Sequence, residues 1–347
     1  MKIVVAILLF CVIIIVHELG HFLLAKMNGI AVREFSIGFG PSLLSYTKNG
    51  TKYALNLIPF GGACIFDDED PENISESSFL NASVWARIAV IAAGPVFNFI
   101  LAFIMSLFLV GSLGYDPAVL VEIQKGSPAE AAGLEAGDVI LKMNHENIKL
   151  YREITMYSFL NQNKPVELTY ERDGQKYQTT LTQQYDEETK RYYYGFLGNT
   201  SGRYTDGTPL DVIKYSVYEV RFWIKSTIKS LGMLIQGQVS KDNVMGPIGI
   251  TQMVGDVYED AAPAGISAIV LSMMDIAILI SANLGVMNLL PIPALDGGRL
   301  MFLIIEAIRR KPIDREKEGM VHFVGFALLM VLMVFILYND IMRLFQR

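Results

Sequence analysis

The chain has 347 residues, of which 52% are hydrophobic and 18% charged, so it is more apolar than an average soluble protein. The charged residues concentrate in the middle of the chain, which predicts membrane segments on either side of a soluble domain. A net charge of −6 without a long basic run gives no reason to expect a nucleic-acid partner, and two cysteines do not make a disulfide framework.

The first apolar segment contains the sequence His17-Glu18-Leu19-Gly20-His21. Two histidines at this spacing lie on one face of a helix and suit a tetrahedral zinc ion, and the glutamate between them can activate a metal-bound water. In hydrocarbon each of these polar groups costs a few kcal/mol unless it is satisfied, and a metal would satisfy them. A cleaved signal peptide fits poorly because no small-residue cleavage site precedes the motif. A structural histidine pair is the remaining alternative.

Four segments are long and apolar enough to span a bilayer, at 2–27, 84–113, 264–290 and 321–337. The connection between the third and fourth is rich in arginine and lysine, and the positive-inside rule places it in the cytoplasm. Both termini and the long section between the second and third segments are then extracytoplasmic. If Lys26 reaches the cytoplasmic interface, the two histidines lie roughly 8 and 13 Å deeper, between that surface and the midplane.

A catalytic zinc ion usually has three protein ligands, so one ligand is missing from the motif. Asp296 follows two prolines that break the third segment, and two glycines after it permit close backbone approach, so its carboxylate can turn towards a cavity at the depth of the histidines. Asp275 lies nearer the outer face, and we interpret it as an acid that faces other helices. His145, in the soluble section, and His322, at the mouth of the fourth segment, are weaker candidates.

Further motifs occur in order along nearly the whole chain. They are Gly38-Phe-Gly40, Pro59-Phe-Gly-Gly62, Ala93-Gly-Pro-Val-Phe-Asn98, Gly246-Pro-Ile-Gly249 and Asn288-Leu-Leu-Pro-Ile-Pro-Ala-Leu-Asp296-Gly297. Together with the histidine motif they resemble the site-2 protease family, in its bacterial RseP/RasP branch. The resemblance implies that Asp296 is the third zinc ligand and that Glu18 is the catalytic base. It also implies cleavage of a transmembrane helix, usually one already shortened by another protease.

The soluble section resembles a bacterial PDZ domain. The resemblance rests on Gly126-Ser-Pro-Ala-Glu-Ala-Ala-Gly-Leu-Glu-Ala-Gly-Asp138, and two later strands flank the hairpin signal Asp173-Gly174. Such a domain binds a peptide or chain end by β-augmentation, or it acts as a size filter that keeps large ectodomains from the membrane site. After it, residues 209–239 have the pattern of an amphipathic helix that lies on the outer membrane face or packs against the domain.

The expected fold class is therefore a polytopic α-helical membrane protein with four transmembrane helices, a membrane-associated β-hairpin or loop at 30–66 and an inserted α+β PDZ domain. The expected divisions are a first membrane half, a PDZ-like domain, an amphipathic helix with a linker, and a second membrane half, at residues 1–114, 115–200, 201–263 and 264–347. The hairpin turns at Asn49-Gly50 and either offers an edge strand to an extended substrate or only covers the site.

Four other residues are expected to contact the substrate. Asn288 can hydrogen-bond the substrate backbone or the oxyanion, or it makes a structural bond to the broken helix. Asn98 can line the same cavity, or it makes a helix–helix hydrogen bond. Gly38 and Gly40 in the loop are the other two.

These observations predict a zinc metalloprotease of the bacterial cell membrane, with both termini and the PDZ-like domain outside. Its partners would be the lipid bilayer, single-pass membrane substrates, and a peptide or chain end on the PDZ-like domain. The resemblance to the site-2 protease family implies substrates such as an anti-sigma factor or signal-peptide remnants. A catalytically inactive membrane-bound PDZ adaptor and a metal transporter are the competing hypotheses.

Overall fold

The computed structural model describes residues 2–67, 77–198, 204, 207–238 and 245–346. Contacts between residues divide the chain into two units, one of residues 1–105 and 223–347 and one of residues 106–222. The predicted boundary between residues 200 and 201 lies outside the described residues, and the predicted four-part division remains a prediction.

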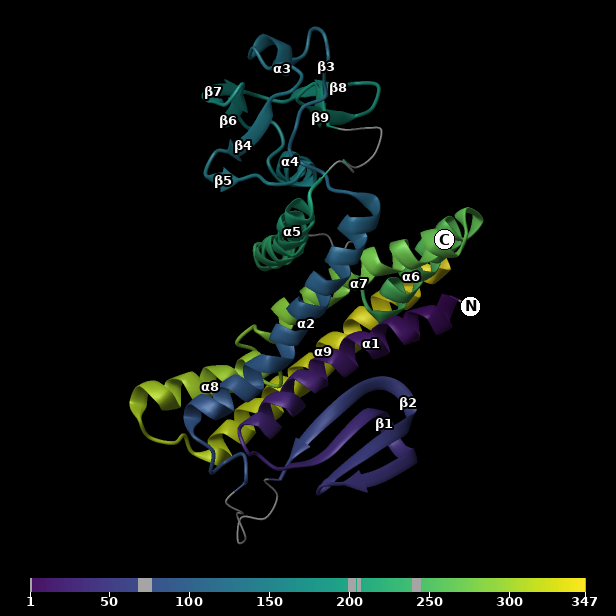
Figure 1. Ribbon diagram of the computed structural model, residues 1–347, viewed down its shortest axis with the longest axis vertical. Helices are drawn as coiled ribbons and strands as arrows, with labels where there is room; N and C mark the ends of the chain where they lie inside the picture. Colours follow the sequence, from purple (N-terminus) through teal and green to yellow (C-terminus); the bar gives the residue numbers. More distant parts are fainter. Residues whose placement is uncertain (1, 68–76, 199–203, 205–206, 239–244, 347) are drawn as a thin grey trace. The chain divides into compact units, whose positions relative to one another are not determined.

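The first unit is built from long apolar helices (Figure 1). They are α1 (Lys2–Met27), α2 (Val84–Leu113, which continues into the second unit), α7 (Ile266–Asn288) and α9 (Arg315–Gln346). Each contains a stretch long and apolar enough to cross a membrane. A helix satisfies its own backbone hydrogen bonds, which is why apolar segments of this length are stable in lipid. The four predicted apolar helices of the fold class are thus confirmed, although the fourth, predicted at 321–337, is longer than expected.

Two shorter helices of this unit were not predicted. The first is α6 (Pro247–Ala261), which a 3₁₀ turn, η2 (Ala262–Ala264), connects to α7. The second is α8 (Asp296–Arg309), which forms about half of what the sequence suggested was only a charged connection between two spans. At 14 residues α8 is too short to cross a bilayer. It is therefore not a further membrane span. Its first residue is Asp296.

The loop after α1 forms a small antiparallel sheet from β1 (Val32–Lys48) and β2 (Thr51–Phe66). The strands meet at Asn49-Gly50, where both residues have positive φ angles, of 50° and 76°, as the predicted turn requires. The strands are long and bend, so that residues 34–37 pair with 52–55 on one side and with 62–65 on the other. The segment 62–65 is therefore an edge of this sheet within the described part of the chain.

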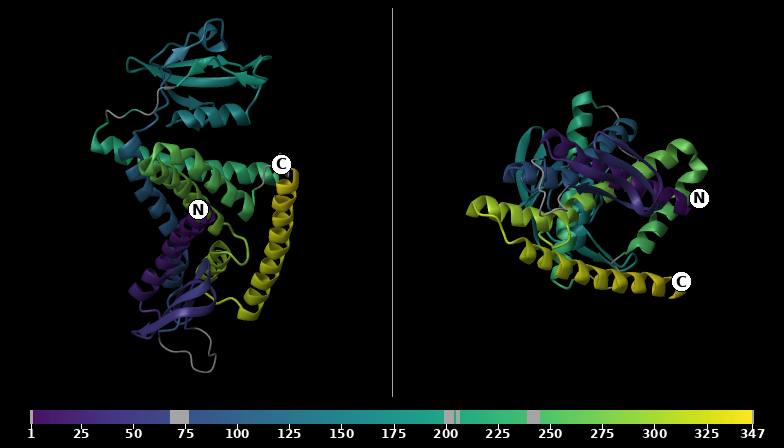
Figure 2. Two further views of the ribbon diagram at one scale, coloured as in Figure 1. Left: turned by 90° about the vertical axis from the view of Figure 1, so that its right-hand side faces the viewer. Right: turned by 90° about the horizontal axis from the view of Figure 1, so that it is seen from below.

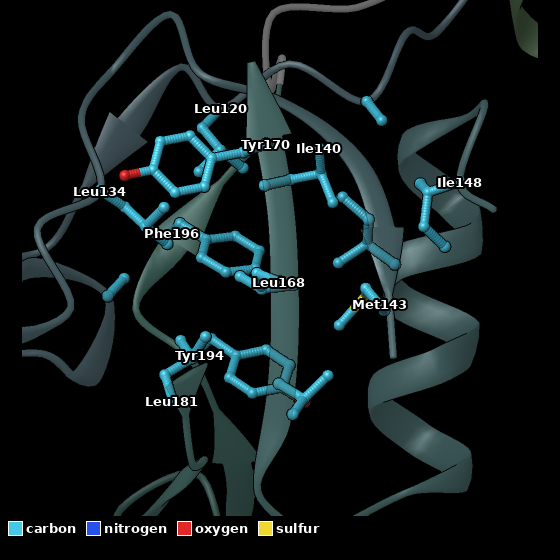
Figure 3. Packing of buried hydrophobic residues seen from close by; sticks show 14 of the residues in the cluster. Leu120, Leu134, Ile140, Met143, Ile148, Leu168, Tyr170, Leu181, Tyr194 and Phe196 are labelled. Atoms are coloured by element: carbon cyan, nitrogen blue, oxygen red, sulfur yellow. The ribbon is translucent and has the colours of Figure 1, made fainter. Parts of the chain in front are cut away.

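The second unit is an α+β domain around one hydrophobic core (Figure 3). Its main sheet has the strand order β5-β4-β6-β7. The elements in chain order are β3 (Glu122–Ile123), α3 (Pro128–Ala131), β4 (Val139–Met143), β5 (Glu146–Asn147), α4 (Tyr151–Leu160), β6 (Val166–Arg172), β7 (Gln175–Leu181), β8 (Gln184–Asp186), β9 (Arg191–Tyr193) and β10 (Phe196–Leu197). The fully buried Asp138 accepts two hydrogen bonds from Arg172, at 2.7 and 2.8 Å, which explains an acid in the Gly-Asp pair of the motif.

The amphipathic helix is α5 (Pro209–Ile235), which crosses from the second unit into the first. In the second unit it packs against α4, because Arg221 pairs with Glu153 at 3.0 Å and Glu219 pairs with Arg152 at 2.8 Å. In the first unit the Thr227 hydroxyl donates a hydrogen bond to Asn283 of α7. The part of α5 up to residue 222 therefore packs against the PDZ-like domain, which is one of the two roles expected for the amphipathic helix.

Candidate metal centre

The two histidines of the motif face inwards from α1. His17 and His21 are 7% and 6% exposed, which for polar groups within an apolar helix requires compensating partners. They are one helical turn apart, and their Nε2 atoms approach to 3.2 Å. Two imidazole nitrogens are thus presented to one point in space.

The third predicted ligand reaches the same point from α8. Asp296 Oδ2 lies 3.1 Å from His17 Nε2 and 3.4 Å from His21 Nε2. The three groups offer ligand atoms that all lie within 4.8 Å of one another. Close approach of α8 to the preceding residues permits this, because a Cβ atom at Gly297 or Gly298 would collide with the backbone of residues 289–293. The structure thus brings the predicted ligand set together.

Hydrogen bonds to the far side of each ring orient the two histidines. His21 Nδ1 donates to the carbonyl oxygen of Val90 at 2.8 Å, which leaves the lone pair of Nε2 directed at Asp296. His17 Nδ1 lies 3.1 Å from the side-chain amide of Asn98, which is fully buried. Asn98 therefore contacts a histidine ring, and its backbone carbonyl also accepts a hydrogen bond from Ser281 of α7 at 2.8 Å.

Two glycines make room for the rings. A Cβ atom at Gly94 of α2 would collide with both imidazoles, and a Cβ atom at Gly20 of α1 would collide with the carbonyl group of Ala93. Small residues at a crossing let two membrane helices approach closely. The Gly94-Pro95 motif of the sequence therefore serves the packing of α1 against α2.

Glu18 lines the same cavity as the three ligands. This cavity has a volume of about 550 Å³, and its walls come from α1, β2, α2, α8 and α9. Glu18 lies against the edge segment of the sheet, since a Cβ atom at Gly62 would be 3.0 Å from its Cγ atom. The residues that line the cavity beside the ligands and Glu18 include Gly62, Ala63, Cys64, Arg299, His322, Phe323 and Phe326.

The other residues singled out in the sequence lie elsewhere. Asn288 ends α7, Asp275 lies in the same helix, and neither is among the residues that line the cavity. Gly38 and Gly40 lie in β1 with φ angles of 82° and 89°, and the carbonyl of Gly38 accepts a hydrogen bond from Asn56 at 2.9 Å. Their contact with substrate remains a prediction.

Sequence reasoning missed two features of the site. His322 was set aside as an interfacial histidine, yet it lines the cavity from α9. The carbonyl of Val90 carries no signal in the sequence, because any residue type supplies a backbone oxygen. The one signal in the sequence for the role of His322 was its place at the start of the fourth apolar segment, at the same membrane depth as Asp296.

The donor set fits zinc. Two imidazole nitrogens and one carboxylate oxygen are the ligands that catalytic zinc sites use, with a further position left for water or substrate. Asp296 Oδ2 is buried without a conventional hydrogen-bond partner in the described part of the chain, as expected for an atom that serves as a ligand.

Comparison with known proteins supports a proteolytic role for such a site. The sequence profile of peptidase family M50 matches residues 5–332. The regulator of sigma-W protease RasP of Bacillus subtilis is 32% identical over 422 aligned residues, which cover 98% of each chain. Metalloprotease MmpA of Caulobacter vibrioides is 33% identical over 370 residues, covering 96% of this chain and 93% of the relative. A solved PDZ domain of an SdrC-like protein of Listeria monocytogenes matches 25% of this chain and 92% of its own length, at 18% identity and a TM-score of 0.23.

Proposed function

Since this chain belongs to peptidase family M50, we propose that His17, His21 and Asp296 hold its catalytic zinc ion and that Glu18 is the catalytic base. The protein is a multi-pass membrane zinc metalloprotease, and we propose that its second unit is a PDZ domain. Membership of the family removes the metal transporter and the inactive adaptor as competing hypotheses. The convergence of three ligand atoms within 4.8 Å carries the assignment of the ligands.

Different residues of the site have different roles in the proposed hydrolysis. Zinc held at this position supplies a Lewis acid that polarises a scissile carbonyl and lowers the pKa of water. Glu18 takes the proton of the attacking water and passes it to the leaving amine, since its side chain lines the cavity beside the ligands. The carbonyl of Val90 and the amide of Asn98 hold the rings in place, so that little reorganisation precedes reaction.

The edge of the β1–β2 sheet favours an extended substrate. A transmembrane helix hides its backbone in hydrogen bonds, so it must unwind locally before hydrolysis. The segment 62–65 is a sheet edge, and its residues Gly62, Ala63 and Cys64 line the cavity beside Glu18. A substrate strand that paired with this edge would replace its lost helical hydrogen bonds. This explains why a sheet in a membrane protein borders its metal cavity.

The proposed substrates are therefore transmembrane segments of single-pass membrane proteins. An anti-sigma factor or a signal-peptide remnant fits this class, and the name of the Bacillus subtilis relative connects that protein with sigma-W. We place both termini and the PDZ-like domain outside the bacterial cell membrane, because the basic residues between the end of α8 and the start of α9, at 309–317, then lie in the cytoplasm.

The PDZ-like domain offers a second binding site. A cavity of about 340 Å³ lies between α4 and residues 192–197, and β10 is a sheet edge that pairs only with β3 within the described residues. An extended chain end could add to this edge. Tyr151 donates a hydrogen bond to the carbonyl of Phe196 at 3.4 Å, so a ligand strand would have to displace this ring. A size filter is the alternative role, and binding of a substrate chain end by wild type and Tyr151→Ala distinguishes the two.

Two matched substitutions test the proposed centre. Glu18→Gln should retain zinc and abolish cleavage of a membrane substrate in proteoliposomes, because the amide cannot accept the proton. Asp296→Asn should release zinc far more readily than Asp275→Asn, since only Asp296 lies within ligand distance of the histidines. Full turnover by Glu18→Gln would remove Glu18 from the mechanism, and the reverse order of zinc loss would exchange the roles of the two acids.

A further inference from the structure

A tight turn delivers Asp296 to the metal centre. Leu295 N donates to the carbonyl of Ile292 at 3.2 Å, which closes a four-residue turn with Pro293 in its second position. Ala294, in the third position, has a φ angle of 78°. This position of such a turn favours glycine, because a Cβ atom makes the left-handed region unfavourable. The residue two positions before Asp296 is thus held in a conformation that alanine does not prefer.

His322 of α9 makes the contact that holds this turn. Its Nδ1 atom accepts a hydrogen bond from the backbone N–H of Ala294 at 2.9 Å. The turn does not use this N–H in its own closing bond, and within the described residues His322 is its acceptor. Because Nδ1 accepts, the neutral ring carries its proton on Nε2, which lies 3.9 Å from a carboxylate oxygen of Glu318. The ring also packs against Phe302 of α8, with 5.6 Å between the ring centroids.

The same face of α9 contacts the turn a second time. A Cβ atom at Gly325, three residues after His322, would collide with Pro293, so the helix and the turn are in close contact. Between Gly325 and Asp340 no residue of α9 is buried, and both views in Figure 2 show the helix at the edge of the helix bundle. His322 and Gly325 therefore mark the place where α9 docks onto the turn.

We propose that His322 is a positioning residue for the metal centre: by accepting the Ala294 N–H it holds the turn and directs the Asp296 carboxylate at His17 and His21. The inference rests on the proposed function, in which Asp296 is the third ligand. It assigns to α9 a role in metal retention, in addition to forming a wall of the cavity.

The test compares two substitutions of the same side chain in the full-length protein. His322→Asn keeps an acceptor near the position of Nδ1, whereas His322→Leu removes it. We expect His322→Leu to release zinc to a chelator about 10–100-fold faster than wild type, the range typical of residues behind a ligand, and His322→Asn to remain within a few-fold of wild type. Excess zinc should restore turnover of His322→Leu. The exposed His145 in the second unit provides the control, and His145→Leu should release zinc at the wild-type rate.

A second variant separates positioning from general damage to the fold. Glycine adopts the φ angle of residue 294 without strain, so Ala294→Gly added to His322→Leu should recover part of the lost zinc retention. Zinc release at the wild-type rate from His322→Leu, while Asp296→Asn releases zinc rapidly, would overturn the inference and leave the proposed ligands intact. Unchanged zinc retention in Asp296→Asn would overturn both.

Discussion

Gly94 of α2 lies directly against the imidazole of His21, so that a Cβ atom at position 94 would occupy the space of the ring. The helices α1 and α2 therefore approach one another so closely beside the metal centre that only the hydrogen atom of a glycine fits at position 94. Neither histidine ring can move away freely, because His21 is hydrogen-bonded to Val90 and His17 to Asn98, both in the same helix as Gly94.

Gly94→Ala should therefore reduce zinc binding by at least about tenfold, because the added methyl group displaces one or both rings. The measurement is zinc content after equilibration with a chelator. Gly111→Ala is the matched control in the same helix, since a Cβ atom there would be 3.8 Å from its nearest neighbour, an ordinary contact. Equal zinc content in the two variants would show that the rings adapt to the methyl group.

Asn98 should support His17 through its amide oxygen. When His17 Nε2 binds a metal, Nδ1 carries the proton, so the amide 3.1 Å away must present an acceptor to it. With Nδ2 at the ring instead, Oδ1 is buried without a hydrogen-bond partner among the described residues. Asn98→Leu should weaken zinc retention about 10–100-fold, and Asn98→Asp should retain most of it because a carboxylate also accepts.

Zinc release from the purified variants checks this prediction. Ser106→Ala serves as the control, since Ser106 is a buried polar residue of the same helix whose hydroxyl makes no hydrogen bond within the described part of the chain. If Asn98→Asp behaves like Asn98→Leu, the amide acts through its N–H groups and the proposed tautomer of His17 is wrong.

The sequence predicted the spans and the metal ligands for different physical reasons. A bilayer demands long apolar segments, so composition alone identified four helices that the structure confirms. The histidine spacing follows from the helical repeat, and polar residues within lipid are few, which left Asp275 and Asp296 as the only acids to compare. The prolines and glycines around Asp296 then indicated the one that could turn inwards.

Other features could not be predicted because they depend on tertiary packing. The sequence of α8 contains charged residues and looks like a cytoplasmic connection. Its formation as a helix depends on docking beside the metal centre, which the sequence does not show. The contact from His322 to Ala294 joins a side chain to a backbone N–H that is 28 residues away, and no residue pattern encodes such a pair. The hydrogen bond from His21 to the carbonyl of Val90 could not be predicted for the same reason, because its acceptor is a backbone group.

Burial raises the pKa of Tyr194 in the PDZ-like domain to about 12. The folded domain therefore keeps this hydroxyl protonated at a pH where the unfolded chain, with a pKa near 10, has ionised it. Its contribution to stability is complete below about pH 10 and is lost as the pH rises towards 12, by roughly 2 kcal/mol in total. The difference between the phenolate absorbance titrations of wild type and Tyr194→Phe should have its midpoint near pH 12, and a midpoint near 10 would contradict the burial of this hydroxyl.

Asp340 should anchor the far end of α9 to the start of α6. Its carboxylate is 3% exposed and accepts hydrogen bonds from the backbone N–H groups of Gly246 at 3.1 Å and Gly249 at 3.0 Å. A carboxylate at a helix N-terminus satisfies unpaired donors and interacts favourably with the helix dipole. Asp340→Leu should therefore lower the free energy of unfolding by about 2–4 kcal/mol, because it leaves the buried N–H of Gly246 and the partly buried N–H of Gly249 unpaired.

Thermal unfolding of the purified protein in detergent measures this effect. Asp340→Asn keeps one acceptor oxygen without the charge, so its midpoint should lie between those of wild type and Asp340→Leu. Because α9 is so little buried elsewhere, loss of this anchor should also make the helix more accessible to added protease than it is in wild type. Equal midpoints for wild type and Asp340→Leu would mean that water or lipid headgroups satisfy the start of α6, and that α9 is held at the metal-centre turn alone.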